Sequence, residues 1–304
     1  MKYRIIFQIL ILFSLSEGGF LKAQDKPDDF PVLKGPYLGR KLPGDTPEIF
    51  APGIISTRNI EFKIAISPDG DEIYFTRQQG RLRTILFTER TVDGWSCPRP
   101  VSFSGKYMDE YPTLSPDGRK LFFQSTRPIP AGLNTSDFRR GFRFWVSTRS
   151  GEDWGEPEIL DARVNIGICI TTVSSEGSIY FFRSSPPKIM MSKWSKGEYS
   201  EPVQLSPIIN DDKYGATAPC LSPDNDYIIF ASGRPSFGKS DLWISFKTFE
   251  GSWNEPKNLG SSINTEFSES APVLSPEGKY LFYTSQGNIY WVDAKIIEEL
   301  RPKE

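Results

Sequence analysis

The segment Leu114-Ser115-Pro116-Asp117-Gly118, followed closely by the apolar strand Leu121-Phe122-Phe123, decides the fold. Proline fixes φ at the first corner of a turn, aspartate folds onto the local backbone, and glycine supplies a positive φ. The phrase therefore predicts a tight hairpin between two strands. Copies of it recur with serines 48 to 59 residues apart, at 66–70, 173–177, 221–225 and 274–278.

A second phrase recurs further along each unit and places an aromatic residue three positions before a proline. Its copies are Trp95-Ser96-Cys97-Pro98, Trp154-Gly155-Glu156-Pro157, Tyr199-Ser200-Glu201-Pro202 and Trp253-Asn254-Glu255-Pro256. An apolar stretch lies between the two phrases, so each unit has four short strands. The strand with the proline must be outermost, because proline cannot donate to an interior ladder. Such repeated four-stranded sheets are typical of propeller blades.

The two ends of the chain complete one blade. The fifth unit lacks the aromatic–proline strand, whereas Pro47-Glu48-Ile49-Phe50 resembles Pro157-Glu158-Ile159-Leu160. We expect residues 47–50 to pair beside Ile289-Tyr290-Trp291 and to close the ring, which removes exposed sheet edges.

The sequence predicts an all-β, five-bladed β-propeller of four-stranded antiparallel blades, closed by an N-terminal strand. Six blades are the alternative, but the spare stretch 24–60 is too short for four more strands. The expected divisions are a signal peptide (1–23), an N-terminal extension (24–45), the propeller (46–293) and a short C-terminal helix or tail (294–304).

The two phrases in register resemble the WD-like propeller repeats of TolB-like exported proteins, and the resemblance covers residues 46–293. It implies export, a β-propeller fold and a binding or scaffolding role. Two turns depart from the pattern, because Ser175 replaces the proline of the third copy and Asn225 replaces the glycine of the fourth.

The N-terminus has the order of a secretory signal. Lys2 and Arg4 precede an apolar run over residues 5–15, and a cleavage point follows Ala23. A membrane anchor is the alternative, but the apolar run is too short to span a bilayer. We therefore expect an exported protein, periplasmic or secreted, with no membrane span after cleavage.

Composition excludes several classes of function. Lysine plus arginine number 36 and aspartate plus glutamate 38, so no basic field for nucleic acid is present. The chain has no histidine, which excludes Ser-His-Asp and Cys-His nucleophile systems and His-ligated zinc. No Asp-rich calcium loop is visible, and no metal or cofactor is expected. Of the three cysteines, Cys169 and Cys220 are expected roughly 10 Å apart, too far for a disulfide.

Charged residues gather at one mouth of the predicted channel, on the face opposite the hairpins. Each inner strand begins about six residues before the serine of its hairpin, where Glu61, Asp109 and Glu269 stand, with Glu110 next to Asp109. The second strands return to this face and end with four arginines: Arg77, Arg127, Arg183 and Arg234. This rim predicts a site for a small polar ligand, a glycan or a protein partner. The alternative is intramolecular arginine–carboxylate pairing that joins the blades.

Two classes of function follow from this rim. The first is an exported, non-catalytic binding propeller. The second is a glycan-active hydrolase or lyase, because the carboxylates of Glu61, Asp109, Glu110 and Glu269 could act as an acid and a base. No spacing singles out such a pair, and neighbouring arginines are expected to keep the carboxylates ionised rather than raise one pKa. The sequence therefore favours binding without catalytic residues.

Overall fold

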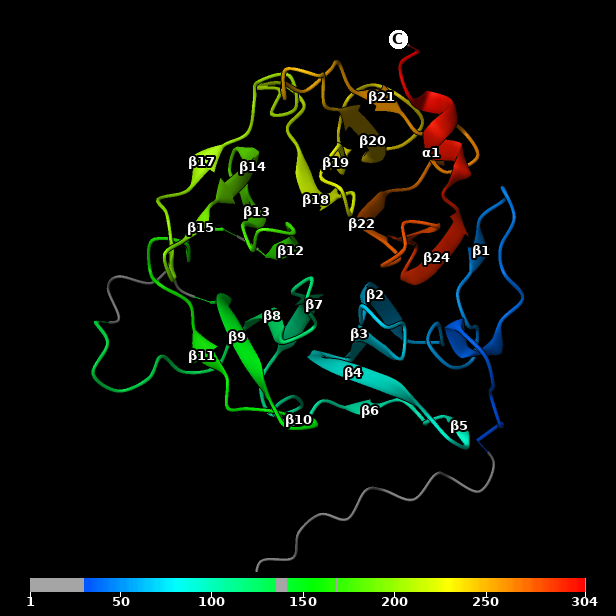
Figure 1. The fold of residues 1–304 in the computed structure, drawn as a ribbon, viewed down its shortest axis with the longest axis vertical. Helices are drawn as coiled ribbons and strands as arrows, with labels where there is room; N and C mark the ends of the chain where they lie inside the picture. The colour runs from blue at the N-terminus through cyan, green and yellow to red at the C-terminus, as the bar shows by residue number, and fades with distance from the viewer. Residues whose placement is uncertain (1–29, 135–140, 168, 304) are drawn as a thin grey trace, which may run out of the picture. The chain divides into compact units, whose positions relative to one another are not determined.

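Five antiparallel sheets surround a common centre and form the blades of a propeller (Figure 1). This arrangement is seen in a computed structural model that describes residues 30–134, 141–167 and 169–303. The residues from Pro31 onward form one compact unit. The predicted five-bladed, all-β propeller is confirmed. The predicted signal peptide lies outside the described residues.

Blades one and two have the same organisation. From the centre outward, blade one has the order β2, β3, β4, and both β5 and β6 pair with β4; blade two repeats this with β7, β8, β9, and with β10 and β11 on β9. The bounds are β2 Ile60–Ile66, β3 Glu72–Gln79, β4 Leu82–Thr91, β5 Gly94–Trp95, β6 Arg99–Pro100, β7 Asp109–Leu114, β8 Lys120–Ser125, β9 Arg143–Ser150, β10 Asp153–Trp154 and β11 Glu158–Ile159.

Blades three and four follow the same order. Blade three runs β12, β13, β14, β17 and carries the small hairpin β15–β16, and blade four runs β18, β19, β20, β21. The bounds are β12 Ile170–Val173, β13 Ile179–Ser184, β14 Pro187–Ser192, β15 Trp194–Ser195, β16 Glu198–Tyr199, β17 Val203–Gln204, β18 Thr217–Leu221, β19 Tyr227–Ser232, β20 Asp241–Phe246 and β21 Lys257–Asn258.

Blade five joins the two ends of the propeller. Its strands β22 (Glu269–Leu274), β23 (Tyr280–Ser285) and β24 (Asn288–Asp293) are completed by β1 (Glu48–Ile49). Glu48 pairs with Trp291 and Ile49 with Tyr290, so the predicted closure is confirmed. Phe50 is fully buried, with its ring 5.0 Å from that of Trp291. The closing strand is therefore held by packing as well as by its ladder.

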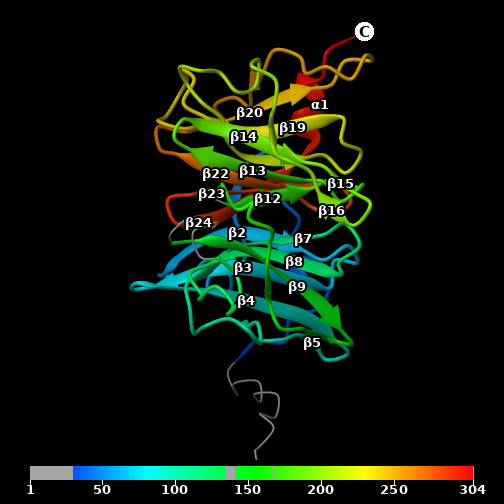
Figure 2. The same cartoon turned by 90° about the vertical axis from the view of Figure 1, so that its left-hand side faces the viewer.

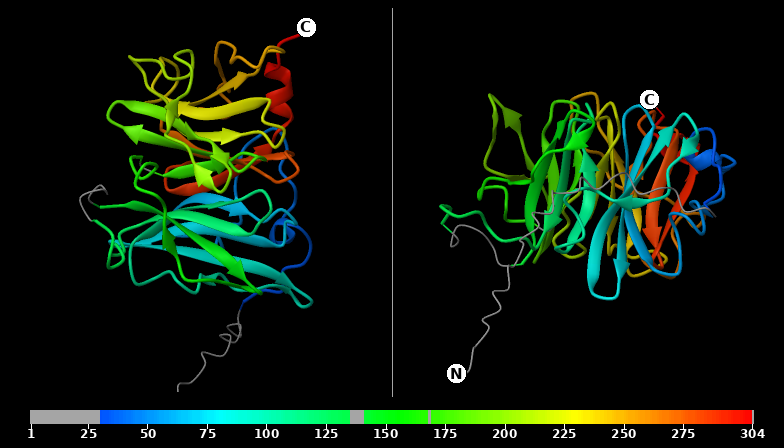
Figure 3. Two further views of the ribbon diagram at one scale, coloured as in Figure 1. Left: turned by 60° about the vertical axis from the view of Figure 1, so that its left-hand side comes forward. Right: turned by 90° about the horizontal axis from the view of Figure 1, so that it is seen from below.

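Short segments at both ends pack onto the blades. The 3-10 turn Tyr37–Gly39 precedes β1, and the Tyr37 hydroxyl donates to Glu277 at 2.6 Å. Helix α1 (Lys295–Leu300) follows β24, and its Ile297 is buried among residues of blades four and five, such as Leu259 and Leu281. Figure 2 and Figure 3 show α1 beside the outer strands of blade four. No helix in the described ranges is long and apolar enough to cross a membrane.

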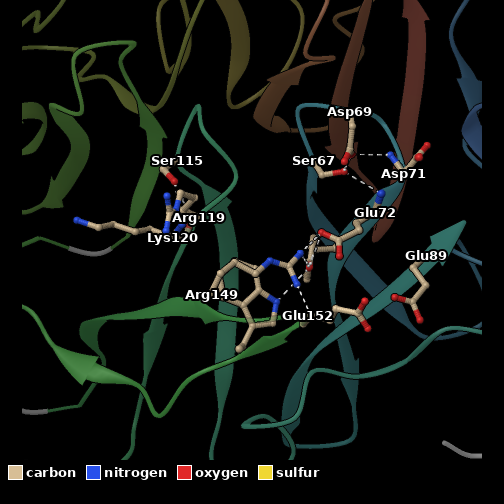
Figure 4. A network of polar contacts seen from close by, with 12 residues as sticks. Ser67, Asp69, Asp71, Glu72, Glu89, Ser115, Arg119, Lys120, Arg149 and Glu152 are labelled. Carbon is tan, nitrogen blue, oxygen red and sulfur yellow. Dashed lines mark hydrogen bonds and ion pairs between the residues drawn. The ribbon is translucent and has the colours of Figure 1, made fainter.

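The hairpins between the first and second strands hold their own turns together. Ser67 donates to Asp69 and accepts from the backbone N–H of Glu72 (Figure 4). The Gly70 N–H donates to the Ser67 carbonyl at 2.8 Å. The Ser67 hydroxyl holds the pKa of Asp69 below its usual value. These carboxylates therefore stabilise turns, as their place in the sequence predicts.

The two departures from the repeat meet in space. Asn225 has a φ of 56°, the left-handed conformation that glycine adopts in the other four hairpins. Its amide donates to the Ser175 hydroxyl of the neighbouring hairpin at 2.8 Å. The turn is therefore kept despite both replacements, and the two residues link blades three and four.

One polar side chain fixes each linker between blades. It accepts a hydrogen bond from a backbone N–H in the third strand of the preceding blade, as Asn264 does from Leu242 at 2.8 Å and Asn210 from Ile189 at 2.7 Å. Both asparagines also donate to backbone carbonyls. The other members of the set are Ser56, Ser104 and Asn165. This five-fold device positions the start of every inner strand.

Candidate functional site

Two buried ion pairs of the predicted rim each lie within a single blade. Glu61 of β2 has no exposed surface, and its Oε1 lies 2.7 Å from Nε of Arg77 in β3, its cross-strand partner. Thr57 of the preceding linker donates to the same carboxylate through its N–H and its hydroxyl. Arg77 in turn donates to the carbonyl of Ile54 at 2.9 Å. The pair therefore fastens the incoming linker to blade one.

Asp109 and Arg127 repeat this arrangement in blade two. One guanidinium nitrogen of Arg127 lies 3.1 and 3.2 Å from the two carboxylate oxygens and 2.9 Å from the carbonyl of Phe103. The same guanidinium lies over the rings of Phe123 and Trp145, at 5.0 and 5.5 Å. Arg127 thus contacts the carboxylate of Asp109, the linker at Phe103 and the aromatic core of the blade.

Glu110 points to a different partner from its neighbour. Its Oε2 lies 2.5 Å from Arg83 of β4 in blade one, and its other oxygen accepts from Gln124 of β8. This pair joins blades one and two, as the pairing alternative predicts. Burial raises the pKa of both Glu110 and Asp109 above their ordinary values, against the opposing effects of their arginines and hydrogen-bond donors. The expectation that arginine would prevent any rise is therefore wrong for these two carboxylates.

The remaining rim residues differ from blade to blade. Glu269 is buried, and it accepts from Thr265 and from Ser285, at 2.7 and 3.0 Å. Arg234 donates to the carbonyl of Ile208 at 2.7 Å, so it also holds a linker. Arg183 is exposed, and the described residues give it no ion pair. Of the eight predicted rim residues, Arg183 is thus the most accessible to a ligand.

A cavity of about 300 Å³ lies at the opposite end of the channel, on the hairpin face. All five inner strands line it, and so does the third residue of every hairpin phrase: Pro68, Pro116, Ser175, Pro223 and Pro276. We call this cavity the central funnel. Its described lining is aliphatic or hydroxyl-bearing, apart from the amide of Asn225, the thiol of Cys220 and the amine of Lys63. No carboxylate is among the described lining residues.

Lys63 reaches across the channel. It stands in β2 of blade one, and its Nζ donates to the carbonyl of Thr171 in β12 of blade three at 2.7 Å. A bulge between Phe62 and Ile64 gives Lys63 a φ of 49°, and Ala218 and Ala271 take the same conformation in other blades. The lysine is 2 % exposed, and both Lys63 and the Thr171 that accepts from its amine line the funnel.

The surroundings of this amine carry no negative charge to balance it. No ion pair to Lys63 occurs among the described residues, and its charged form is desolvated. Burial lowers the pKa of Lys63 to about 8, and the smaller, opposing effects come from the thiols of Cys220 and Cys169. Burial raises the pKa of Cys220 to about 11. Cys169 and Cys220 form no disulfide with each other, as their expected separation predicted. A lone amine that is partly neutral at mild pH therefore forms the floor of the funnel.

Sequence analysis missed the funnel and Lys63. The repeat directed attention to positions filled alike in several blades, whereas this position holds Lys63, Tyr111, Ala218 and Ala271. The one signal in the sequence was a lysine inside the otherwise apolar run of an inner strand, at 60–66.

The described residues offer no metal site. No group of three or more cysteine, aspartate and glutamate side chains that could hold a metal ion occurs among them.

Comparison with known proteins identifies the architecture. No family model and no curated protein matches the sequence. Among solved structures, TolB from Acinetobacter baumannii matches 78% of this chain at 16% identity, with a TM-score of 0.52. The fold is a propeller distantly similar to that of TolB. The match spans 55% of the TolB chain.

A structure of an enzyme matches to a similar extent. A thermostable family-43 glycoside hydrolase matches 77% of this chain and 88% of its own at 11% identity, with a TM-score of 0.50. Both likenesses concern the fold alone, because TolB and a glycoside hydrolase share it at low identity.

Proposed function

We propose that this chain is an exported, non-catalytic binding propeller whose ligand occupies the central funnel. One observation carries the proposal: a cavity of about 300 Å³ converges from the five hairpins onto a single buried amine. Pockets for small ligands are concave, mostly apolar and supplied with a few polar groups. The funnel has all of these features.

The glycan hydrolase is the weaker candidate. Glycoside hydrolysis needs two carboxylates that flank a substrate. Glu61, Asp109, Glu110 and Glu269 are each at most 2 % exposed and accept hydrogen bonds from the protein itself. A sugar would have to displace those donors before it reached any of the four. We therefore favour binding over hydrolysis.

Binding of a glycan or a protein partner at the rim remains a separate proposal. Arg183 is its most accessible candidate, and Arg83, whose side chain is 35% exposed, is the next. If a partner uses the rim, Arg183→Ala should weaken its binding without loss of stability, because the described structure gives this side chain no partner to lose.

The funnel is tested by closing its entrance. Ser175 is exposed at the mouth and lacks the proline ring of its counterparts, so Ser175→Trp places an indole over the opening. Lys193→Trp is the matched control, because Lys193 is exposed in the same blade and does not line the cavity. In a screen of small molecules against the purified protein, hits should be lost in Ser175→Trp and kept in Lys193→Trp. Hits that survive in both variants would contradict the proposal.

A further inference from the structure

The amine of Lys63 lacks the partners that a buried ammonium normally has. An ammonium group carries three donors. The part of the chain that the structure describes supplies one acceptor, the Thr171 carbonyl at 2.7 Å, and no carboxylate in the lining of the funnel. Buried charges in proteins are usually paired, since an unpaired ion in a low-dielectric site is costly. A ligand that enters the funnel can supply the missing negative charge.

We propose that the central funnel binds a small monocarboxylate with an apolar body, whose carboxylate pairs with the ammonium of Lys63; this inference rests on the proposed function of the funnel. The walls fit such a body, because Ile66, Leu114, Leu221 and Val273 line them. Hydroxyl groups, such as that of Thr172, add hydrogen-bonding capacity near the floor.

The charge balance favours a monoanion. Lys63 is the only lysine or arginine among the described lining residues, so one negative charge neutralises the site. A dianion would bring a second charge into an apolar space with nothing to pair it, which costs several kcal/mol per ion. A cation would meet an amine that repels it once protonated. The single lysine therefore favours a ligand that carries one negative charge.

The test compares acids with neutral analogues of the same shape. Hexanoate and hexanamide are titrated against the purified wild type, Lys63→Met and Lys279→Met by calorimetry near pH 7. Methionine keeps the length and apolar character of the lysine stem, and Lys279 is an exposed lysine that serves as the charge control. Ser175→Trp is included to report whether any binding occurs in the funnel.

We expect hexanoate to bind the wild type and Lys279→Met alike, and to bind Lys63→Met about 10- to 100-fold more weakly, as expected for a lost charge-assisted hydrogen bond. Hexanamide should bind the wild type and Lys63→Met equally. Equal binding of acid and amide to both proteins, abolished in Ser175→Trp, would overturn the carboxylate inference and leave the funnel as a binding site. No binding of either probe at about 10 mM would overturn both.

Proton uptake gives a second readout that a merely structural lysine would not produce. At pH 9 the free amine is mostly neutral, and pairing with a carboxylate requires its protonation. Cys220 and Cys169, which interact electrostatically with Lys63, stay protonated at this pH because burial raises the pKa of both. Burial also raises the pKa of Tyr111, and the nearby Glu110 is paired with Arg83.

Calorimetry at pH 9 in two buffers of different ionisation enthalpy should therefore show uptake of about one proton per hexanoate bound. Hexanamide should show none. The same measurement on Lys63→Met serves as the control, because it removes the titrating group. Uptake that persists in Lys63→Met would assign the proton to another residue and overturn the inference.

Discussion

Replacement of Lys63 by methionine should stabilise the protein in a pH-dependent way. The lysine is fully buried, and burial lowers its pKa from 10.5 to about 8. A shift of this size corresponds to about 3 kcal/mol. Methionine has nearly the same shape and no charge to desolvate. We expect Lys63→Met to raise the free energy of unfolding by about 3 kcal/mol at pH 7.

The pH dependence has a definite sign. The folded-state pKa lies below the unfolded value, so the folded protein binds fewer protons between pH 8 and pH 10.5. The stability of the wild type, relative to Lys63→Met, therefore rises with pH across this window. Below pH 8 the whole cost of burial is present, and near pH 10.5 it disappears. The difference between the two proteins should fall by about 1.4 kcal/mol per pH unit in the middle of the window.

Urea unfolding of the wild type and Lys63→Met at pH 7, 8, 9 and 10 measures this difference directly. Subtraction of the two proteins cancels the other groups that titrate in the same range. Lys279→Met controls for removal of a positive charge from an exposed position. A difference that does not change with pH, or a Lys63→Met protein less stable than the wild type at pH 7, would refute the burial of an unpaired amine.

Three further predictions concern the scaffold. Asn264→Ala should lower the free energy of unfolding by about 1–3 kcal/mol in urea denaturation, because it leaves the buried Leu242 N–H without an acceptor. Phe50→Ala should cost about 3–5 kcal/mol in the same assay, since the ring is fully buried where the two chain ends meet. Cys169 should react with a thiol reagent only after unfolding, because its side chain is fully buried. Fast labelling of Cys169 in the native protein would contradict the packing of the channel.

The repeats were enough to predict the fold, because the geometry of each blade follows from its hairpin turns and the lengths of its strands. The spacing of the hairpins fixed the strands, and the match between residues 47–50 and 157–160 fixed the closure. The same register placed Arg77 at the same mouth of the channel as Glu61, and the structure shows the two residues paired across neighbouring strands. In each case a period of two along a strand is enough to place a residue.

The burial of the rim could not be predicted in this way. The linker that covers Glu61 binds it through Thr57, and such contacts depend on the path of a loop with no period. The position of the Lys63 side chain could not be predicted for a different reason. A bulge between Phe62 and Ile64 interrupts the alternation of side chains, so the pattern of β2 does not show that the lysine enters the channel.

The contrast between the two channel ends indicates how repeats should be interpreted in such a ring. A residue type that recurs at one position in several blades has a structural role that every blade needs. Glu61, Asp109 and Glu269 have such a role, because each accepts hydrogen bonds from side chains of the protein and so stabilises its own inner strand. A ligand in the central channel contacts all five blades, and a polar side chain from one of them is enough to recognise it. A charge that occurs in one blade and crosses to another, as Lys63 does to Thr171, is the arrangement expected for such a contact. The departures from the repeat are therefore the better guide to the site.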